Sequence, residues 1–145
     1  MKHGAKKKIL FVCIGNSCRS QMAEGFARAY GSDVLIAASA GLMPASAVAS
    51  DTAHAMLEKN ITLRDHFPKH IRQLGRARFD LIVNMSGVDL EAVPGESVIS
   101  WTVTDPIRET YERHCEIRDE IERLVMNLVL DLRRKNPDSA SNGGM

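Results

Sequence analysis

The sequence predicts a three-layer α/β fold in which helices cover both faces of a four-stranded parallel sheet. Short, continuous apolar runs recur along the chain, as they do in strands that are buried on both faces. Segments with helical spacing of apolar residues separate these runs, and strands that alternate with helices are typical of parallel βαβ units. The length of 145 residues suits one domain of common size.

The first elements flank a glycine-containing loop. The apolar run Lys8–Cys13 predicts a buried strand. A helix is expected after the loop, and Gly31 gives it a stop signal. The apolar positions of that helix are Met22, Ala23, Phe26, Ala27 and Tyr30. The run Val34–Ala37 predicts a second buried strand, which leads into the loop Ser39–Pro44.

The middle of the chain contains two helical segments and a third strand. Ser50 and Asp51 are expected to cap a helix that carries the apolar residues following them. Pro68 is expected to open a short helix that reaches Leu74. The apolar run Phe79–Val83 then predicts the third strand.

The last part of the chain contains a weaker fourth strand and a long helix. Ser97–Ser100 is the strand, and an amphipathic helix is expected from about Arg108 to Lys135. One stripe of this helix is apolar and consists of Ile117, Ile121, Leu124, Val125, Leu128 and Leu132. Pro137 ends the helix, so we expect one domain over residues 1–136 and a disordered polar tail over residues 137–145.

Composition and charge exclude several classes of protein. The net charge of +1 gives no field that would attract nucleic acid or an acidic membrane surface. No stretch is long and apolar enough to span a bilayer, and no secretory signal is convincing. The three cysteines lack the number and spacing of a disulfide framework, which indicates a reducing compartment. We therefore expect a cytoplasmic protein without nucleic-acid or membrane partners.

Cys13 is the strongest candidate for chemistry, because it ends a strand and begins a loop that leads into a helix. Backbone N–H groups of such a loop can converge on an anion, and the helix adds its positive end. Arg19 follows six residues later and can grip two oxygens of a tetrahedral oxyanion. The same field stabilises a thiolate. The sequence thus predicts Cys13 as nucleophile in an oxyanion-binding loop that also contains Ile14, Gly15, Asn16, Ser17, Cys18 and Ser20.

Asp105 is the second candidate, in the Asp105-Pro106 pair that precedes the long helix. A cysteine phosphatase needs an acid that protonates the leaving oxygen, and a positioned carboxyl can supply the proton. Asp-Pro is also a common turn dipeptide, so the spacing alone leaves both interpretations open.

Together, these residues resemble the motifs of a known protein superfamily. The Cys-x5-Arg-Ser loop after the first strand, with Asp-Pro before the last helix, resembles the low-molecular-weight protein tyrosine phosphatase superfamily. The segment Gly15–Gly25 looks closer still to the thioredoxin-coupled arsenate reductase branch of that superfamily. Residues 39–41, 79–83 and 101–106 support the resemblance, which spans roughly residues 7–133. It implies a phosphatase-like catalytic domain with a parallel sheet of strand order 2-1-3-4.

The resemblance also implies roles for individual residues. Cys13 would be the nucleophile, Arg19 the oxyanion clamp and Asp105 the general acid, with Asn16 and Ser20 as loop support. His66 matches a position that supports the loop through a hydrogen bond. No cofactor is implied, apart from a structural potassium ion that the reductase branch can hold near Asn16, Glu24 and Ser39. No Cys/His set has zinc spacing, and Pro68 between His66 and His70 argues against a helical metal pair.

Two departures from the family separate the possible functions. The reductase branch carries two further cysteines after the third strand, and here Ser86 and Val93 stand where those thiols are expected. Eukaryotic-type phosphatases place aromatic residues directly after Asp-Pro, and here Ile107 and Arg108 follow. The first departure argues against an internal thiol relay, and the second argues against phosphotyrosine specificity.

Three functions remain from the sequence alone. The first expectation is a cysteine-dependent phosphatase that hydrolyses a phosphorylated protein or a small phosphoester through a phosphocysteine. The alternative is an arsenate reductase that uses the same loop with an external thiol donor. A third interpretation is a non-catalytic oxyanion sensor with Cys13 and Cys18 as a redox pair, although Cys18 is equally explained as a small loop-packing residue.

Overall fold

The computed structural model describes residues 5–75, 77–91 and 96–135, so the tail predicted after Pro137 lies outside the described residues. Four parallel strands form one sheet in the order β2-β1-β3-β4. Their bounds are β1 Lys7–Cys13, β2 Leu35–Gly41, β3 Leu81–Asn84 and β4 Ser97–Ser100. The predicted α/β class and strand order are confirmed.

The strands end together at one edge of the sheet, and this edge positions the candidate site. Cys13 at the end of β1 pairs with Gly41 at the end of β2. On the other side of β1, Val12 pairs with Asn84, which in turn pairs with Ser100 of β4. Loops that leave the carboxyl ends of parallel strands commonly form the ligand sites of α/β proteins.

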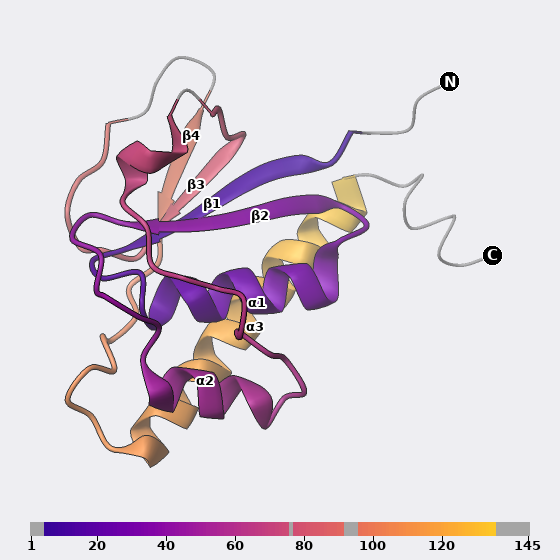
Figure 1. Ribbon diagram of the computed structural model, residues 1–145. Coiled ribbons are helices and arrows are strands. Elements are labelled where there is room, and N and C mark those ends of the chain that lie inside the picture. The colour runs from indigo at the N-terminus through magenta and orange to yellow at the C-terminus, as the bar shows by residue number, and fades with distance from the viewer. Residues whose placement is uncertain (1–4, 76, 92–95, 136–145) are drawn as a thin grey trace.

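The α-helices lie on one side of the sheet, with α2 packed against α1 and α3, as Figure 1 shows. They are α1 Arg19–Gly31, α2 Ser50–Leu57 and α3 Tyr111–Lys135. Strand residues of this face and the apolar sides of the helices form the larger core. Its fully buried members include Ile9, Phe11, Met22, Phe26, Met56, Val83, Ile117, Ile121 and Val125. The apolar stripe predicted on the last helix therefore packs into this core.

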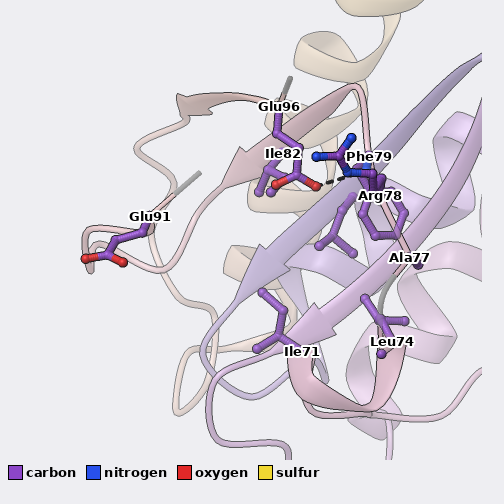
Figure 2. Close-up of a pocket in the computed structure, with 10 residues that line it drawn as sticks. Ile71, Leu74, Ala77, Arg78, Phe79, Ile82, Glu91 and Glu96 are labelled. Atoms are coloured by element: carbon purple, nitrogen blue, oxygen red, sulfur yellow. Dashed lines mark hydrogen bonds between the residues drawn. The ribbon is translucent and has the colours of Figure 1, made fainter. Parts of the chain in front are cut away.

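The opposite face has a thinner cover, the single-turn 3-10 helix η1 Ile71–Leu74. Its apolar side chains pack on a second cluster made by Leu10, Val12, Ala40 and Ile82. A hollow of about 300 Å³ lies beside this helix, and Figure 2 shows Ile71, Leu74 and Phe79 around it. The backbone N–H of Phe79 donates to Glu96 Oε2 at 3.0 Å at its rim. The described residues that line this hollow include no cysteine, serine or histidine.

Several predicted boundaries were wrong for identifiable reasons. The last helix starts at Tyr111 rather than near Arg108, because Arg108 has φ 68° and lies in a turn in which Glu109 N donates to Pro106 O at 2.9 Å. The N-cap of α2 is Ala49 without a side-chain cap, so Ser50 and Asp51 lie inside the helix. The short helix begins at Ile71 and is capped by His70, three residues after its expected start.

Within the described ranges, no helix is both long and apolar enough to cross a membrane.

Candidate active site

The loop Cys13–Ser20 turns its carbonyl groups outward. The carbonyl oxygens of Cys13, Ile14, Gly15 and Ser17 accept hydrogen bonds from the backbone N–H groups of Leu42, Met43, Ala45 and Ala49, at 3.2, 2.8, 2.9 and 3.1 Å. Asn16 O accepts from Gln21 Nε2 at 3.1 Å, and Cys18 O accepts from Met22 N at 2.9 Å. The C=O and the following N–H of a trans peptide point in opposite directions. The N–H groups of residues 14–19 therefore point inward, as an anion-binding nest requires.

Gly41 supports the loop from the neighbouring strand. A Cβ atom at Gly41 would lie 2.6 Å from Ile14 O and 3.0 Å from Asn16 N. Both neighbours are backbone atoms of the loop, so they have little freedom to move aside. A Cβ at Gly15, within the loop itself, would make only ordinary contacts, the nearest being Ser17 Oγ at 3.5 Å. The close approach that glycine permits is therefore needed at Gly41.

Asn16 connects the loop to the nucleophile. It is fully buried and has φ 51°, in the left-handed region that asparagine tolerates better than most residues. Its Nδ2 donates to Ser20 Oγ at 2.7 Å and to Ser39 Oγ at 3.0 Å. Ser20 Oγ lies 2.9 Å from Cys13 Sγ. Because Ser20 accepts from Asn16, its own hydroxyl proton can be donated to the sulfur, which a thiolate nucleophile requires.

Arg19 is held by carbonyl groups from distant parts of the chain. Its Nη1 donates to Met85 O at 2.6 Å and to Val103 O at 3.1 Å. Its Nη2 lies 3.5 Å from Asp105 Oδ2, while Nε is buried and has no partner among the described residues. A buried donor without an acceptor is costly. An oxyanion bound beside Cys13 could supply the acceptor that Nε lacks.

Asp105 borders the cavity over the loop. This cavity has a volume of about 270 Å³ and is lined by Cys13, the loop, Arg19, Asp105 and the apolar side chains of Met43, Ala45 and Ile107. The side chain of Asp105 is 45% exposed, and its Oδ1 accepts from Ile107 N at 3.1 Å. The structure thus brings together the predicted nucleophile, clamp and acid, and the arrangement can bind a tetrahedral oxyanion, attack it and protonate a leaving oxygen.

Cys18 is buried beside the nucleophile loop. Burial raises the pKa of the Cys18 thiol, and hydrogen bonds with Thr52 and Ser17 offset only part of this rise. Thr52 Oγ1 in turn lies 3.1 Å from His114 Nε2. Burial also lowers the pKa of His114, so this imidazole is neutral near pH 7. Cys18 is therefore a protonated thiol within a small polar cluster between the loop, α2 and α3.

His66 reaches the loop through Gln21 and makes no direct hydrogen bond to it. Its Nδ1 lies 2.9 Å from Gln21 Oε1, and Gln21 Nε2 donates to Asn16 O and to Phe67 O. Burial lowers the pKa of His66. Since Gln21 Oε1 can only accept, the His66 ring donates from Nδ1. His66 therefore fixes Gln21, and Gln21 fixes the loop.

Sequence reasoning missed Gln21 and the carbonyl groups that hold Arg19. Gln21 stands beside the apolar residues Met22 and Ala23, which is a weak signal, and only the structure shows that its amide is fully buried and therefore needs partners. The carbonyl oxygens of Met85 and Val103 left none, since every residue type has a carbonyl. Of the two positions expected to carry relay thiols in the reductase branch, Val93 lies outside the described residues. Ser86 hydrogen-bonds Asn84 Oδ1 at 2.6 Å.

Comparisons with known proteins show the family to which the chain belongs. The family model described as low molecular weight phosphotyrosine protein phosphatase matches residues 8–138. The glutaredoxin arsenate reductase of Synechocystis sp. is 33% identical over 128 residues, which are 85% of this chain and 96% of that protein. The arsenate reductase of Halalkalibacterium halodurans is 32% identical over 130 residues, which are 83% of this chain and 93% of that protein.

Similar solved structures include both an arsenate reductase and a tyrosine phosphatase. An arsenate reductase in the phosphate binding state has a TM-score of 0.76 and 28% identity, covering 87% of this chain and 98% of its own. The low molecular weight protein tyrosine phosphatase from T. tengcongensis has a TM-score of 0.74 and 25% identity, covering 87% of this chain and 99% of its own. Because the family model spans most of the sequence, the chain is an enzyme that belongs to the low molecular weight phosphotyrosine protein phosphatase family, with arsenate reductases among its relatives.

Proposed function

We propose that this protein reduces arsenate to arsenite with an external thiol as reductant. The observation that carries the proposal is the inward-facing N–H nest around Cys13, closed by Arg19, in a chain whose similar proteins include a glutaredoxin arsenate reductase. The sequence alone favoured phosphomonoester hydrolysis. The named relatives support the reductase alternative better.

The first step would be attack by the Cys13 thiolate on arsenic. The loop N–H groups and Arg19 would hold the oxygens of arsenate, which is close to phosphate in size and charge. A sulfur–arsenic bond forms, and one arsenic–oxygen bond breaks. Asp105 can give a proton to the departing oxygen, so that it leaves as water.

The second step needs a thiol, and the chain itself offers a poor one. An attacking thiolate forms a disulfide with Cys13 Sγ, the sulfur–arsenic bond breaks, and its electron pair reduces arsenic to arsenite. Cys18 is buried, and its raised pKa keeps it protonated. Cys115 lies on α3, 4.0 Å from Glu58 Oε2, and does not line the cavity over Cys13. A first external thiol therefore forms the disulfide with Cys13. A second external thiol then attacks this disulfide, which restores the Cys13 thiol and leaves the two external thiols joined to each other as a disulfide.

The test is arsenite release with a panel of thiol donors: glutathione alone, glutathione with glutaredoxin, and thioredoxin with its reductase. We expect turnover with at least one donor, no turnover for Cys13→Ser, and near wild-type turnover for Cys18→Ser and Cys115→Ser. Loss of turnover in Cys18→Ser, with the fold intact by circular dichroism, would overturn the external-thiol step. Folded wild-type protein that releases no arsenite with any donor would overturn the reductase proposal.

Phosphomonoester hydrolysis is the second candidate, and the position of Asp105 favours it. A carboxyl at the cavity mouth, 3.5 Å from Arg19 Nη2, suits protonation of an alkoxide or phenoxide leaving group. Cys13 would form a phosphocysteine, which water would then hydrolyse. The described lining of the cavity contains no aromatic side chain to flank a phosphotyrosine ring. We expect an aryl phosphate to be hydrolysed slowly, with no activity in Cys13→Ser and a loss of about 100-fold in Asp105→Ala. An active Cys13→Ser protein would refute this route.

A further inference from the structure

The potassium site that the family resemblance implies does not fit the residues of this chain. Asn16 Oδ1 accepts from Lys69 N at 2.9 Å. Glu24 Oε1 accepts from Ser39 Oγ at 2.5 Å, and Glu24 Oε2 lies 2.6 Å from Arg28 Nη2. The side-chain oxygens that would hold the ion are therefore already bound to groups of the protein. In the described part of the chain, no cluster of three His, Cys, Asp or Glu residues could bind a metal.

A side-chain cation occupies this region instead. Lys69 Nζ donates to Ser39 O at 3.3 Å and to Phe67 O at 3.2 Å, and it lies 4.7 Å from the centre of the Phe67 ring. Carbonyl oxygens around a compact charge are the ligands that a monovalent cation would also use. Burial lowers the pKa of the Lys69 ammonium, and the nearby Glu24 carboxylate offsets part of this shift. A potassium ion here would add a third positive charge beside Lys69 and Arg28, which already face the carboxylate of Glu24.

We propose that the Lys69 ammonium is a built-in replacement for a monovalent cation and holds the nucleophile loop in place, so that the protein needs no potassium. Lys69 is a positioning residue, because it touches neither Cys13 nor the cavity over it. The inference does not depend on whether the substrate is arsenate or a phosphomonoester.

The proposed effect travels through a short series of contacts. Lys69 Nζ holds the backbone of Ser39 on β2, and the Ser39 hydroxyl accepts from Asn16 Nδ2 at 3.0 Å. The same Asn16 nitrogen donates to Ser20 Oγ, which lies 2.9 Å from Cys13 Sγ. Lys69 also donates from its backbone N–H to Asn16 Oδ1, and any substitution except proline keeps that bond. Removing the ammonium alone therefore loosens the backbone of Ser39. Because Asn16 connects Ser39 to Ser20, the Ser20 hydroxyl beside Cys13 Sγ is then held less firmly.

The test compares wild type, Lys69→Ala and the control Lys59→Ala in potassium chloride and in choline chloride at equal ionic strength. Lys59 is a partly exposed lysine whose Nζ lies 3.0 Å from Glu122 Oε1, and it has no contact with the loop. The melting temperature and the rate of Cys13 alkylation by iodoacetamide, followed by mass spectrometry, are measured. Neither readout needs substrate, so a failed activity assay leaves this test intact.

We expect wild type and Lys59→Ala to give the same values in both salts. In choline chloride, Lys69→Ala should melt about 3–6 °C lower, and its Cys13 alkylation rate should change at least about threefold. Potassium, but not choline, should restore at least about half of both changes, because it can enter the vacated carbonyl site. Lys69→Arg, which keeps a charge, should show no such dependence on potassium.

Three results would overturn the proposal. The first is a potassium-dependent rise of several degrees in the melting temperature of wild type. The second is a Lys69→Ala protein in which neither the melting temperature nor the Cys13 alkylation rate changes. The third is a change in these two quantities that potassium does not reverse, which would make Lys69 an ordinary packing residue. If Lys69→Ala does not fold in choline chloride, Lys69→Gln keeps an uncharged donor to the carbonyl groups, and the same comparison applies to it.

Discussion

The replacement Gly41→Ala tests whether the neighbouring strand shapes the nucleophile loop. The added Cβ would lie 2.6 Å from Ile14 O, 3.0 Å from Asn16 Cβ and 3.0 Å from Asn16 N. These atoms belong to the segment whose N–H groups face the anion, so the clash can be relieved only by moving the loop or β2. Overpacking of this kind costs about 1–3 kcal/mol. For a domain of this length, the cost corresponds to a melting temperature lowered by about 3–10 °C.

The effect on activity should exceed the effect on stability. A displacement of several tenths of an ångström moves the N–H donors away from the oxyanion, and a misplacement of about 1 Å can cost about 100-fold in rate. The assay is kcat/KM for the active substrate, measured well below the melting temperature of the variant. The expected result is a loss of about 10- to 100-fold in a folded protein.

Gly31→Ala is the matched control, because its clash is equally tight but lies elsewhere. Its Cβ would lie 2.7 Å from Val129 Cγ2 and 3.2 Å from Leu35 Cδ2, and both atoms are at the ends of side chains. We expect a comparable or smaller loss of stability with kcat/KM unchanged. If Gly41→Ala keeps kcat/KM within threefold of wild type, or if Gly31→Ala is equally inactive, β2 does not shape the loop through Gly41.

Further predictions concern polar contacts inside the fold. Gln21→Leu should destabilise the protein by about 1–3 kcal/mol, because it leaves the buried carbonyl group of Asn16 without a donor, whereas Phe67 O keeps its contact with Lys69 Nζ, and urea unfolding would measure this. His114 has a folded-state pKa below its unfolded value, so the unfolded state binds more protons. Its contribution to stability is therefore present above the unfolded pKa of about 6.5 and is lost as pH falls below it. The difference in urea midpoint between pH 7.5 and 5.5 should shrink in His114→Gln, and an unchanged difference would contradict this assignment. Arg133 makes two contacts of 2.8 Å with the exposed Asp33 carboxylate and one of 2.6 Å with a carbonyl, so Arg133→Ala should cost only about 1 kcal/mol.

Much of the fold could be predicted from the sequence because its signals are local. The strand before Cys13 is a continuous apolar run, and β1 was predicted to within one residue. The run Ser97–Ser100 was predicted with its bounds. By contrast, β2 was predicted to end at Ala37 but continues to Gly41. Small residues after Ala37 carry little strand signal, and the pairing with β1 through Cys13 holds them in the sheet.

The candidate site could be predicted where it consists of side chains with a recognisable motif, and it could not where it consists of backbone groups from distant segments. Cys13, Arg19 and Asp105 do meet around one cavity. The carbonyl oxygens that hold Arg19 come from Met85 and Val103, more than sixty positions away. Lys69 carries no signal of its role in the sequence, because only the folded chain places its ammonium against Ser39 and Phe67. The turn at Arg108, with φ 68°, also has no signal in an arginine side chain.

The segment over residues 42–49 holds the loop with backbone atoms alone, and this has an evolutionary consequence. Met43 N and Ala45 N donate to successive loop carbonyl groups, while the residue between them is Pro44, which has no N–H to give. The side chains of Met43 and Ala45 meanwhile line the cavity mouth. Natural selection can therefore exchange these side chains, and with them the preferred substrate, without disturbing the backbone hydrogen bonds that hold the anion-binding loop. Proteins named for arsenate reduction and for tyrosine dephosphorylation can thus diverge on one unchanged scaffold.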